Sequence, residues 1–242
     1  MSGKPYPSVA VRLLAGLCLL AAVLLIATPA SAAPSAGEAS WIRSLAPELS
    51  PRVVTRAMRA LGCNADPSIR DARILAIIDY SLPSTAKRLW VFDRSERRLL
   101  FHELVAHGKN SGGNFATTFS NTNGSLQSSL GLFRAAETYE GGNGYSLRLD
   151  GLDPEVNDLA RERLIVIHGA WYVGPQHAEQ YGRLGRSWGC PALEPHLAKP
   201  IIDTLKHGAA LFVSAEDQQW LEHEANRCGG DVMTAGVSTA GR

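Results

Sequence analysis

Short apolar runs separated by turn-forming residues dominate the chain from residue 74 to residue 213. The first run, Ile-Leu-Ala-Ile-Ile-Asp-Tyr at 74–80, is typical of a buried strand, and residues 88–92 and 99–106 flank a charged turn as the two arms of a hairpin do. Further strands are predicted over 132–135, 145–149, 164–167 and 209–213. The pattern therefore predicts a mostly β fold, either a twisted sandwich or a partly closed barrel, with peripheral α-helices.

Helical patterns lie toward the edges of this β region. Pro51 begins an amphipathic stretch that Gly62 ends, and proline suits the first turn because its missing N–H has no partner there. Residues 194–206 form a second amphipathic stretch, which Gly208 stops. Residues 108–131 are rich in Gly, Ser, Asn and Thr, and a loop of that length inside a domain is more often functional than idle.

The first 32 residues have the pattern of a cleaved export signal. Lys4 and Arg12 supply positive charge, residues 13–28 are apolar, and residues 30–32 read Ala-Ser-Ala, the small-x-small form of a cleavage site. The apolar run is too short to favour a membrane span. We therefore expect export to the periplasm or cell envelope, with no stable membrane span after cleavage.

The rest of the chain is expected to form one domain with short extensions. The predicted divisions are an N-terminal helical preface over 33–71, a main domain over 72–228 and a disordered tail over 229–242; residues 33–40 are small and polar and are also expected to be disordered. About 210 residues can bury one substantial core. Cleavage leaves 22 basic against 23 acidic residues. This balance, with no basic cluster, argues against a nucleic-acid partner.

Three cysteines remain after cleavage: Cys63, Cys190 and Cys228. An exported protein usually pairs its cysteines, so an odd one suggests a reactive thiol. Cys190 is the candidate for the free thiol, and Cys63 and Cys228 would then join the preface to the C-terminal segment. The alternative, in which those two also stay free, remains open because sequence does not give their distance.

Two motifs carry the candidate chemistry. Ile167-His168-Gly169 ends an apolar strand, and Cys190 follows Gly189 about twenty residues later. A thiol becomes a strong nucleophile when a base removes its proton, and histidine titrates near neutral pH. A small residue before the cysteine lets a substrate carbonyl approach backbone N–H groups. The pair predicts acyl transfer through a thioester; the alternative is an inert buried cysteine beside a core histidine.

The sequence around this pair resembles a known family. His-Gly-x-Trp-Tyr-Val-Gly begins at His168, and Gly-Arg-x-Gly-Arg-Ser-Trp-Gly-Cys-Pro-Ala-Leu ends at Leu193. Together they resemble the L,D-transpeptidase catalytic domain (YkuD-like family), in the branch whose nucleophile motif reads Ser-x-Gly-Cys-Pro. Further matching segments are Phe119-Ser120-Asn121, Ser128-Ser129-Leu130-Gly131 and Gly144-Tyr145-Ser146-Leu147-Arg148-Leu149. The resemblance spans roughly residues 72–214, with Trp188 and Ala192 departing from the commoner branch, which has a histidine and an Arg or Asn there.

The resemblance implies a mixed β fold with the nucleophile in a loop at one rim, Cys190 as nucleophile and His168 as base. It also implies a substrate: the tetrapeptide stem of peptidoglycan, cut before its terminal D-alanine and joined to the side-chain amine of a neighbouring stem as a 3→3 cross-link. Water as acceptor would give L,D-carboxypeptidase activity. A backbone carbonyl is expected to orient His168, because no carboxylate stands in an obvious position.

Other candidates surround the pair, each with an alternative reading. The N–H groups of Gly189 and Cys190 are the candidate oxyanion hole. Ser187 could bond the histidine or substrate, or be a plain turn serine; Trp188 could wall the pocket or belong to the core. Tyr172 could line the pocket. Arg186 and Arg183 could meet stem carboxylates, with solvated surface arginines as the alternative.

Several other function classes are disfavoured. The sequence has no His-Glu-x-x-His or paired Cys-x-x-Cys spacing for a metal, and no phosphate loop or dinucleotide fingerprint for a cofactor. A papain-like protease has its cysteine before its histidine, which is the reverse of the order here. The remaining alternatives are a stem-peptide hydrolase on the same scaffold and a catalytically idle wall-binding domain.

Overall fold

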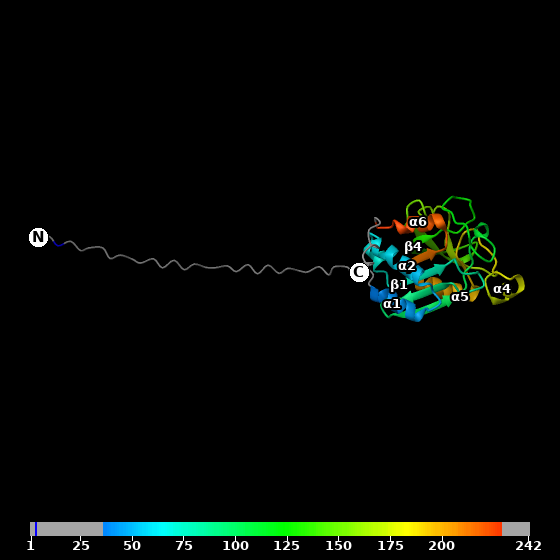
Figure 1. Cartoon of the computed structure of the whole chain (residues 1–242), viewed down its shortest axis with the longest axis horizontal. Helices are drawn as coiled ribbons and strands as arrows, with labels where there is room; N and C mark the ends of the chain where they lie inside the picture. The colour runs from blue at the N-terminus through cyan, green and yellow to red at the C-terminus, as the bar shows by residue number, and fades with distance from the viewer. Residues whose placement is uncertain (1–2, 4–35, 229–242) are drawn as a thin grey trace, which may run out of the picture. The chain divides into compact units, whose positions relative to one another are not determined.

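A mixed sheet forms the centre of the domain, and its strands follow the order β3-β2-β1-β8-β4-β5-β6-β7 (Figure 1). The computed structural model describes residue 3 and residues 36–228. The strands are β1 Ile74–Asp79, β2 Leu89–Asp93, β3 Arg98–Glu103, β4 Gly131–Gly141, β5 Gly144–Gly151, β6 Val166–Gly169, β7 Ala192–Leu193 and β8 Ala210–Ser214. The pairs β1–β8 and β6–β7 are parallel, and the other pairs are antiparallel.

The two ends of this sheet meet. Ala106 follows β3 by three residues, and its N–H donates to the carbonyl of Ala192 in β7 at 2.9 Å while Ala192 N–H donates back at 3.3 Å. This bridge brings the chain beyond the first strand of the sheet against the last strand. The partly closed barrel predicted from the sequence is therefore confirmed, with β7 and the loop before it at the seam.

Helices pack around the sheet and explain why its central strands are continuously apolar. They are α1 Ala36–Leu45, α2 Pro51–Cys63, α3 Pro67–Arg70, α4 Pro175–Tyr181, α5 Pro195–Leu205 and α6 Gln218–Ala225, with a 3-10 turn at Lys109–Ser111. Helix α2 packs on β4 and β8, and α5 packs on β1, β5 and β6. Figure 1 shows α1 and α2 at one end of the domain and α4 at the other. A strand covered on both faces has no polar alternation, which is the pattern of β8.

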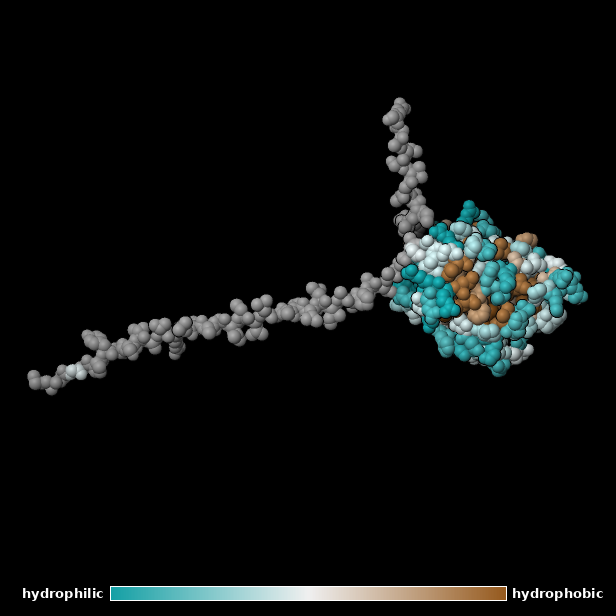
Figure 2. Space-filling view, turned by 90° about the horizontal axis from the view of Figure 1, so that it is seen from below, coloured by the Kyte–Doolittle hydropathy of each residue, from teal (hydrophilic) through white to brown (hydrophobic). Residues whose placement is uncertain are grey.

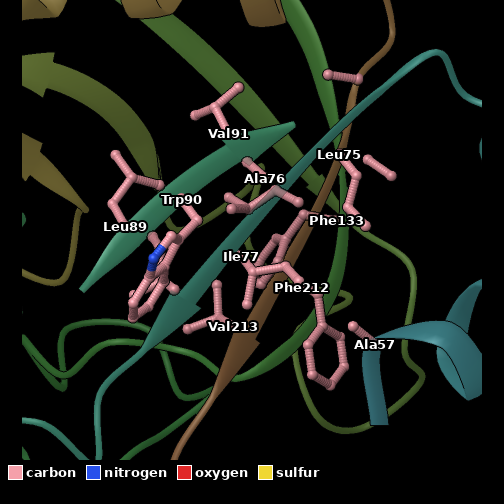
Figure 3. Packing of buried hydrophobic residues seen from close by; sticks show 14 of the residues in the cluster. Ala57, Leu75, Ala76, Ile77, Leu89, Trp90, Val91, Phe133, Phe212 and Val213 are labelled. Atoms are coloured by element: carbon pink, nitrogen blue, oxygen red, sulfur yellow. The ribbon is translucent and has the colours of Figure 1, made fainter. Parts of the chain in front are cut away.

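One part of the core lies between α2 and the central strands, and side chains of α5 and α6 belong to the same cluster. Trp90, Phe133 and Phe212 are buried against Leu75 and Ile77 (Figure 3). Side chains of α1 and α2 belong to the same core. Hydrophobic residues also reach the surface in the middle of the face shown in Figure 2, where hydrophilic residues surround them.

Two expectations about the N-terminal part have different outcomes. The helix predicted from Pro51 is confirmed as α2, with proline in its first turn. The disorder predicted for 33–40 is wrong over residues 36–40, which belong to α1. The physical reason is that Ile42 of α1 is fully buried and Glu38 pairs with Arg94 through both of its carboxylate oxygens.

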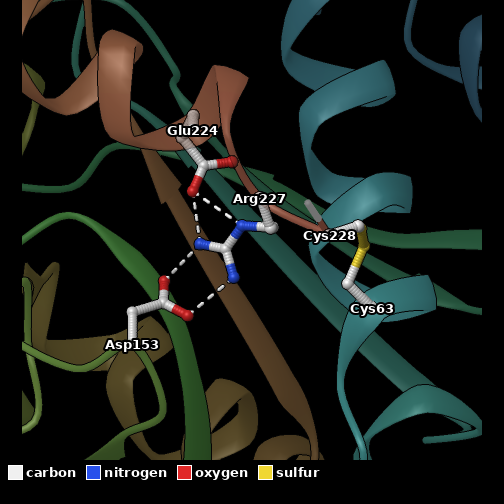
Figure 4. Close-up of a disulfide and its surroundings, with 5 residues drawn as sticks. All are labelled: Cys63, Asp153, Glu224, Arg227 and Cys228. Carbon is white, nitrogen blue, oxygen red and sulfur yellow. Dashed lines mark hydrogen bonds and ion pairs between the residues drawn. A yellow bond between two sulfur atoms is a disulfide. The ribbon is translucent and has the colours of Figure 1, made fainter. Parts of the chain in front are cut away.

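The predicted disulfide is present. Cys63 at the end of α2 is bonded to Cys228 after α6, with their Cα atoms 5.6 Å apart (Figure 4). Beside it, Arg227 donates to both carboxylate oxygens of Asp153, at 2.7 and 2.6 Å, and its Nε donates to Glu224 at 2.8 Å. The bond and this ion-pair network attach the C-terminal segment to α2 and to the loop after β5.

The export signal predicted over 1–32 and the tail predicted over 229–242 lie outside the described residues, apart from residue 3. Within the described part of the chain, each helix is too short or too polar to cross a membrane.

Candidate active site

Cys190 and His168 line one cavity of about 500 Å³ at the rim of the barrel. Its walls come from the loop before β4, the β4–β5 turn, the start of β6 and the turn before β7. The other lining residues include Tyr139, Arg163, Leu164, Val166, Tyr172, Arg186, Ser187 and Trp188. Segments far apart in the sequence therefore converge on one volume, which is within the range of about 300–1,000 Å³ of small-molecule sites.

The strand β6 holds His168 rigidly. Its Cα lies opposite Ser146 of β5 on one side and Ala192 of β7 on the other. Its Nδ1 lies 3.0 Å from the carbonyl of Gly169, so Nδ1 carries the proton and Nε2 keeps the lone pair. Burial lowers the pKa of His168, and the bond to Gly169 only partly opposes this. The imidazole is therefore neutral near neutral pH and can accept a proton.

The thiol of Cys190 rests against the backbone at the start of β6. Val166 N–H donates to Sγ at 3.4 Å, and the S–H donates to the carbonyl of Leu164 at 3.6 Å. The residue is 8% exposed, and burial raises the pKa of its thiol. A protonated thiol of this kind needs a base before it can attack. His168 lies on the same cavity, and catalytic hydrogen bonds are often looser in a site without substrate.

The turn that carries Cys190 is fixed by hydroxyl groups. Ser187 Oγ accepts from Gly189 N–H at 3.1 Å and donates to the carbonyl of Cys190 at 2.6 Å. Ser128 Oγ donates to the carbonyl of Gly189 at 3.1 Å. Gly189 has φ of 125°, and a Cβ there would lie 2.8 Å from the carbonyl oxygen of Gln127, so only glycine fits.

This geometry revises two expectations about the turn. The N–H of Gly189 is bound to Ser187 Oγ, so it is not directed at an oxyanion in this structure. The N–H of Cys190 has no acceptor among the described residues. Ser187 acts as the turn serine, the plainer of its two expected roles.

The remaining predicted site residues separate into lining and non-lining groups. Trp188 lines the cavity and is 75% exposed, so it belongs to the wall and not to the core. Tyr172 also lines it, and burial raises its pKa to about 12. Arg186 reaches the cavity but donates to the carbonyl of Gly112 at 2.9 Å, which joins it to the preceding loop. Arg183 is not among the lining residues and donates to the carbonyl of Leu184.

Residues 45–214 match the family model of the L,D-transpeptidase catalytic domain. The chain belongs to this family. The match contains the strands that build the cavity and both members of the Cys–His pair. Among residues 36–228, no three His, Cys, Asp or Glu side chains come together as a metal site.

Solved structures of L,D-transpeptidases are similar to this chain at low identity. One from Mycobacterium smegmatis is 17% identical, with a TM-score of 0.36, over 59% of this chain and 59% of that one. L,D-transpeptidase 1 from Mycobacterium tuberculosis is 14% identical, with a TM-score of 0.33, over 59% of this chain and 61% of that one. One from Stackebrandtia nassauensis is 12% identical, with a TM-score of 0.34, over 76% and 79%. The matched part of this chain thus spans less than two thirds of the length of the two mycobacterial proteins. No curated protein matches it.

Arg163 is a cavity residue that sequence reasoning missed. Its guanidinium donates to the Oγ of Ser129 and Ser125 and to the carbonyls of Ser120 and Gln127, all of them neutral acceptors. Its positive charge lowers the pKa of the Cys190 thiol, against the larger effect of burial. The feature of the sequence that could have indicated Arg163 is the hydroxyl-rich loop over 108–131, because this loop supplies every one of its acceptors.

A second missed feature lies behind the turn that carries Cys190. His107 is fully buried, its Nδ1 lies 2.8 Å from the Nη2 of Arg88, and its carbonyl accepts from Ser187 N–H at 3.0 Å. Burial, with the charge of Arg88, lowers the pKa of His107 to about 4. His107 is therefore a neutral support for the turn that carries Cys190.

Proposed function

We propose that the chain is an exported L,D-transpeptidase that forms 3→3 cross-links between peptidoglycan stems, with Cys190 as nucleophile and His168 as base. The observation that carries the proposal is that a buried thiol and a neutral imidazole with a free Nε2 face one cavity in a member of this family. Export is supported by the first 32 residues and by the disulfide, which persists in oxidising compartments.

The first half-reaction transfers the acyl group to sulfur. His168 Nε2 takes the thiol proton, and Sγ attacks the carbonyl between the third residue of a tetrapeptide stem and its D-alanine. The carbon–nitrogen bond breaks, and the leaving amine takes the proton from the imidazolium. D-alanine departs and the stem remains on Cys190 as a thioester.

The second half-reaction releases the stem to an amine. The side-chain amine of a diamino acid on a neighbouring stem attacks the thioester and gives a proton to His168. The carbon–sulfur bond breaks and the proton returns to sulfur, so the enzyme is regenerated. Water in place of the amine gives L,D-carboxypeptidase activity with the same residues.

Three features of the cavity support these steps. The unbonded N–H of Cys190 can donate to the oxyanion of each tetrahedral intermediate. Trp188 and Tyr172 supply apolar walls for the stem. The charge of Arg163 favours the thiolate over the thiol.

The test is mass spectrometry of products from disaccharide-tetrapeptide muropeptides incubated with the chain lacking residues 1–32. A cross-linked dimer with loss of D-alanine, formed by the wild type and absent with Cys190→Ala, supports transpeptidation. Loss of D-alanine without dimer would move the activity to carboxypeptidase. Unchanged substrate, with the thiol unreactive toward alkylating agents, would favour a wall-binding domain and defeat the proposal.

A further inference from the structure

A second cavity, of about 550 Å³, lies between α4 and the start of α5. It is lined by three aromatic or imidazole rings, those of Trp171, His177 and Tyr181, together with the polar side chains of Gln176, Gln180 and Glu194. We call it the aromatic cleft. We propose that it binds a sugar ring, an N-acetylated hexosamine of the glycan strand whose stem peptide enters the catalytic cavity.

Two of the three rings of the aromatic cleft are open to solvent. Trp171 is 81% exposed and Tyr181 is 56% exposed. The ring of His177 lies between them, with its centroid 5.8 Å from Trp171 and 4.5 Å from Tyr181. A single exposed aromatic ring is ordinary, but three adjoining rings form a surface that gains free energy when a ligand covers it.

The backbone under Trp171 is held in place before any ligand arrives. Ala170 N–H donates to the carbonyl of Leu193 at 2.8 Å, and Val173 N–H donates to the carbonyl of Ala170 at 3.0 Å. The ring of Tyr172 contacts that of Trp171 edge-on, with centroids 5.8 Å apart. A platform that is already ordered loses little conformational entropy on binding.

The chemistry of the lining matches a neutral sugar better than a peptide stem. A pyranose has a face of C–H groups that packs on the negative face of an aromatic ring, and a rim of hydroxyl and acetamido groups that need hydrogen bonds. Gln176, Gln180 and Glu194 supply such partners. The described lining contains no Lys or Arg, and it does contain the carboxylate of Glu194. The terminal carboxylate of a donor stem would meet repulsion from Glu194 there.

The aromatic cleft adjoins the catalytic cavity, and this part of the argument rests on the proposed function. Tyr172 lines the catalytic cavity while its ring touches Trp171, which lines the cleft. Trp171 also follows His168 by three residues. A stem peptide is covalently attached to its sugar, so a stem held at Cys190 leaves its sugar within reach of a neighbouring cleft.

The first experiment measures sugar binding apart from catalysis. Titration calorimetry of Cys190→Ala with a peptide-free tetramer of β-1,4-linked N-acetylglucosamine should show binding, and adding Trp171→Ala should weaken it about tenfold. Phe115→Ala is the matched control, because Phe115 is 52% exposed but lines neither cavity. No binding of the tetramer, equal weakening by both substitutions, or competition by a free tetrapeptide would overturn the proposal.

The second experiment uses turnover. Trp171→Ala should raise KM for a disaccharide-tetrapeptide about tenfold and leave KM for the sugar-free tetrapeptide unchanged. An equal rise for both substrates would overturn the proposal, because it would point to a peptide site. Sugar binding by Cys190→Ala does not require turnover, so failure of the sugar site and failure of the transpeptidase assignment give different results.

Discussion

Two regions of the molecule differ in how their buried charged groups are paired. One surrounds the Cys63–Cys228 disulfide, and the other surrounds the free thiol of Cys190. Near the disulfide, Arg227 is paired on both sides, with Asp153 and with Glu224, and the side chains of both acids are almost fully buried. This region joins the C-terminal segment to the domain. Each buried charge there has a partner of opposite sign.

Around Cys190 the buried basic groups lack such partners. Arg163 reaches the cavity with only neutral oxygen acceptors, and His168 is buried and held neutral. Because no carboxylate neutralises Arg163, its positive charge lowers the pKa of the Cys190 thiol. Because His168 is neutral, its Nε2 lone pair can accept a proton. The paired Arg227 thus fixes the C-terminal segment, whereas the unpaired Arg163 lies at the candidate active site, where its charge acts on the Cys190 thiol.

The largest expected effect is on the rate of acylation, when the Nε2 lone pair of His168 is removed. His168→Gln should lower the rate of acylation by about 10²–10⁴-fold, because that is the usual contribution of a positioned base. Single-turnover kinetics with a muropeptide donor measures it. His223→Gln, on the exposed side of α6, is the control. A rate for His168→Gln equal to that of the control would remove His168 from the mechanism.

Breaking the paired region should affect stability instead of chemistry. Arg227→Gln leaves two carboxylates buried without their cation, so we expect a loss of about 3–5 kcal/mol in the free energy of unfolding. Arg161→Gln is the matched control: Arg161 pairs with Glu137 and Asp150 but is 46% exposed, so its loss should cost at most about 1 kcal/mol. Urea denaturation compares the two. Similar losses would show that burial does not distinguish these networks.

The neutral His107 behind the turn that carries Cys190 should make the free energy of unfolding depend on pH. Its folded pKa of about 4 lies below the ordinary value of 6.5, so the unfolded chain takes up a proton first as the pH falls. The stabilisation is complete above about pH 6.5 and decreases by about 3 kcal/mol as the pH falls to about 4. His168, whose pKa is also lowered, contributes in the same direction. Urea denaturation across this range should show a shallower slope for His107→Gln; an unchanged slope would contradict the assignment.

The smallest expected effect is on the pKa of the Cys190 thiol, and it tests whether Arg163, unlike the paired Arg227, acts through its charge. Arg163→Gln should raise the pKa of the Cys190 thiol, so the pH profile of its alkylation by iodoacetamide should move to higher pH. Arg163→Lys keeps the charge and should stay near the wild-type profile. If glutamine and lysine give the same profile, the charge of Arg163 does not act on the thiol.

The sequence predicted those parts of the fold whose signal is local. The apolar runs of β1 and β8 and the amphipathic pattern of α2 and α5 were sufficient, and the odd cysteine count correctly paired Cys63 with Cys228. Helix α4 was missed because none of its residues is buried, so it has no apolar periodicity to detect.

The sequence indicated which residues line the candidate site better than it indicated which contacts they make. The predicted strand over 164–167 begins at Val166 instead, because Leu164 has φ of 58° and belongs to a turn. The acceptors of Arg163 lie 34–43 residues away in the chain, a distance at which no sequence pattern applies. Arg183 and Gly189 have the residue types that the predicted roles need, but residue type does not decide where a guanidinium or an N–H points: Arg183 donates to the carbonyl of Leu184, and Gly189 N–H donates to Ser187 Oγ.

In the proposed mechanism, Cys190 carries the acyl group between the two half-reactions. Intact-mass and peptide-level mass spectrometry, after an acid quench of the chain with a disaccharide-tetrapeptide donor and no added amine, tests it most directly. The expected result is an adduct of the donor less D-alanine on the peptide that contains Cys190, absent from Cys190→Ala. Product formation by Cys190→Ala, or an adduct on any other residue, would contradict it.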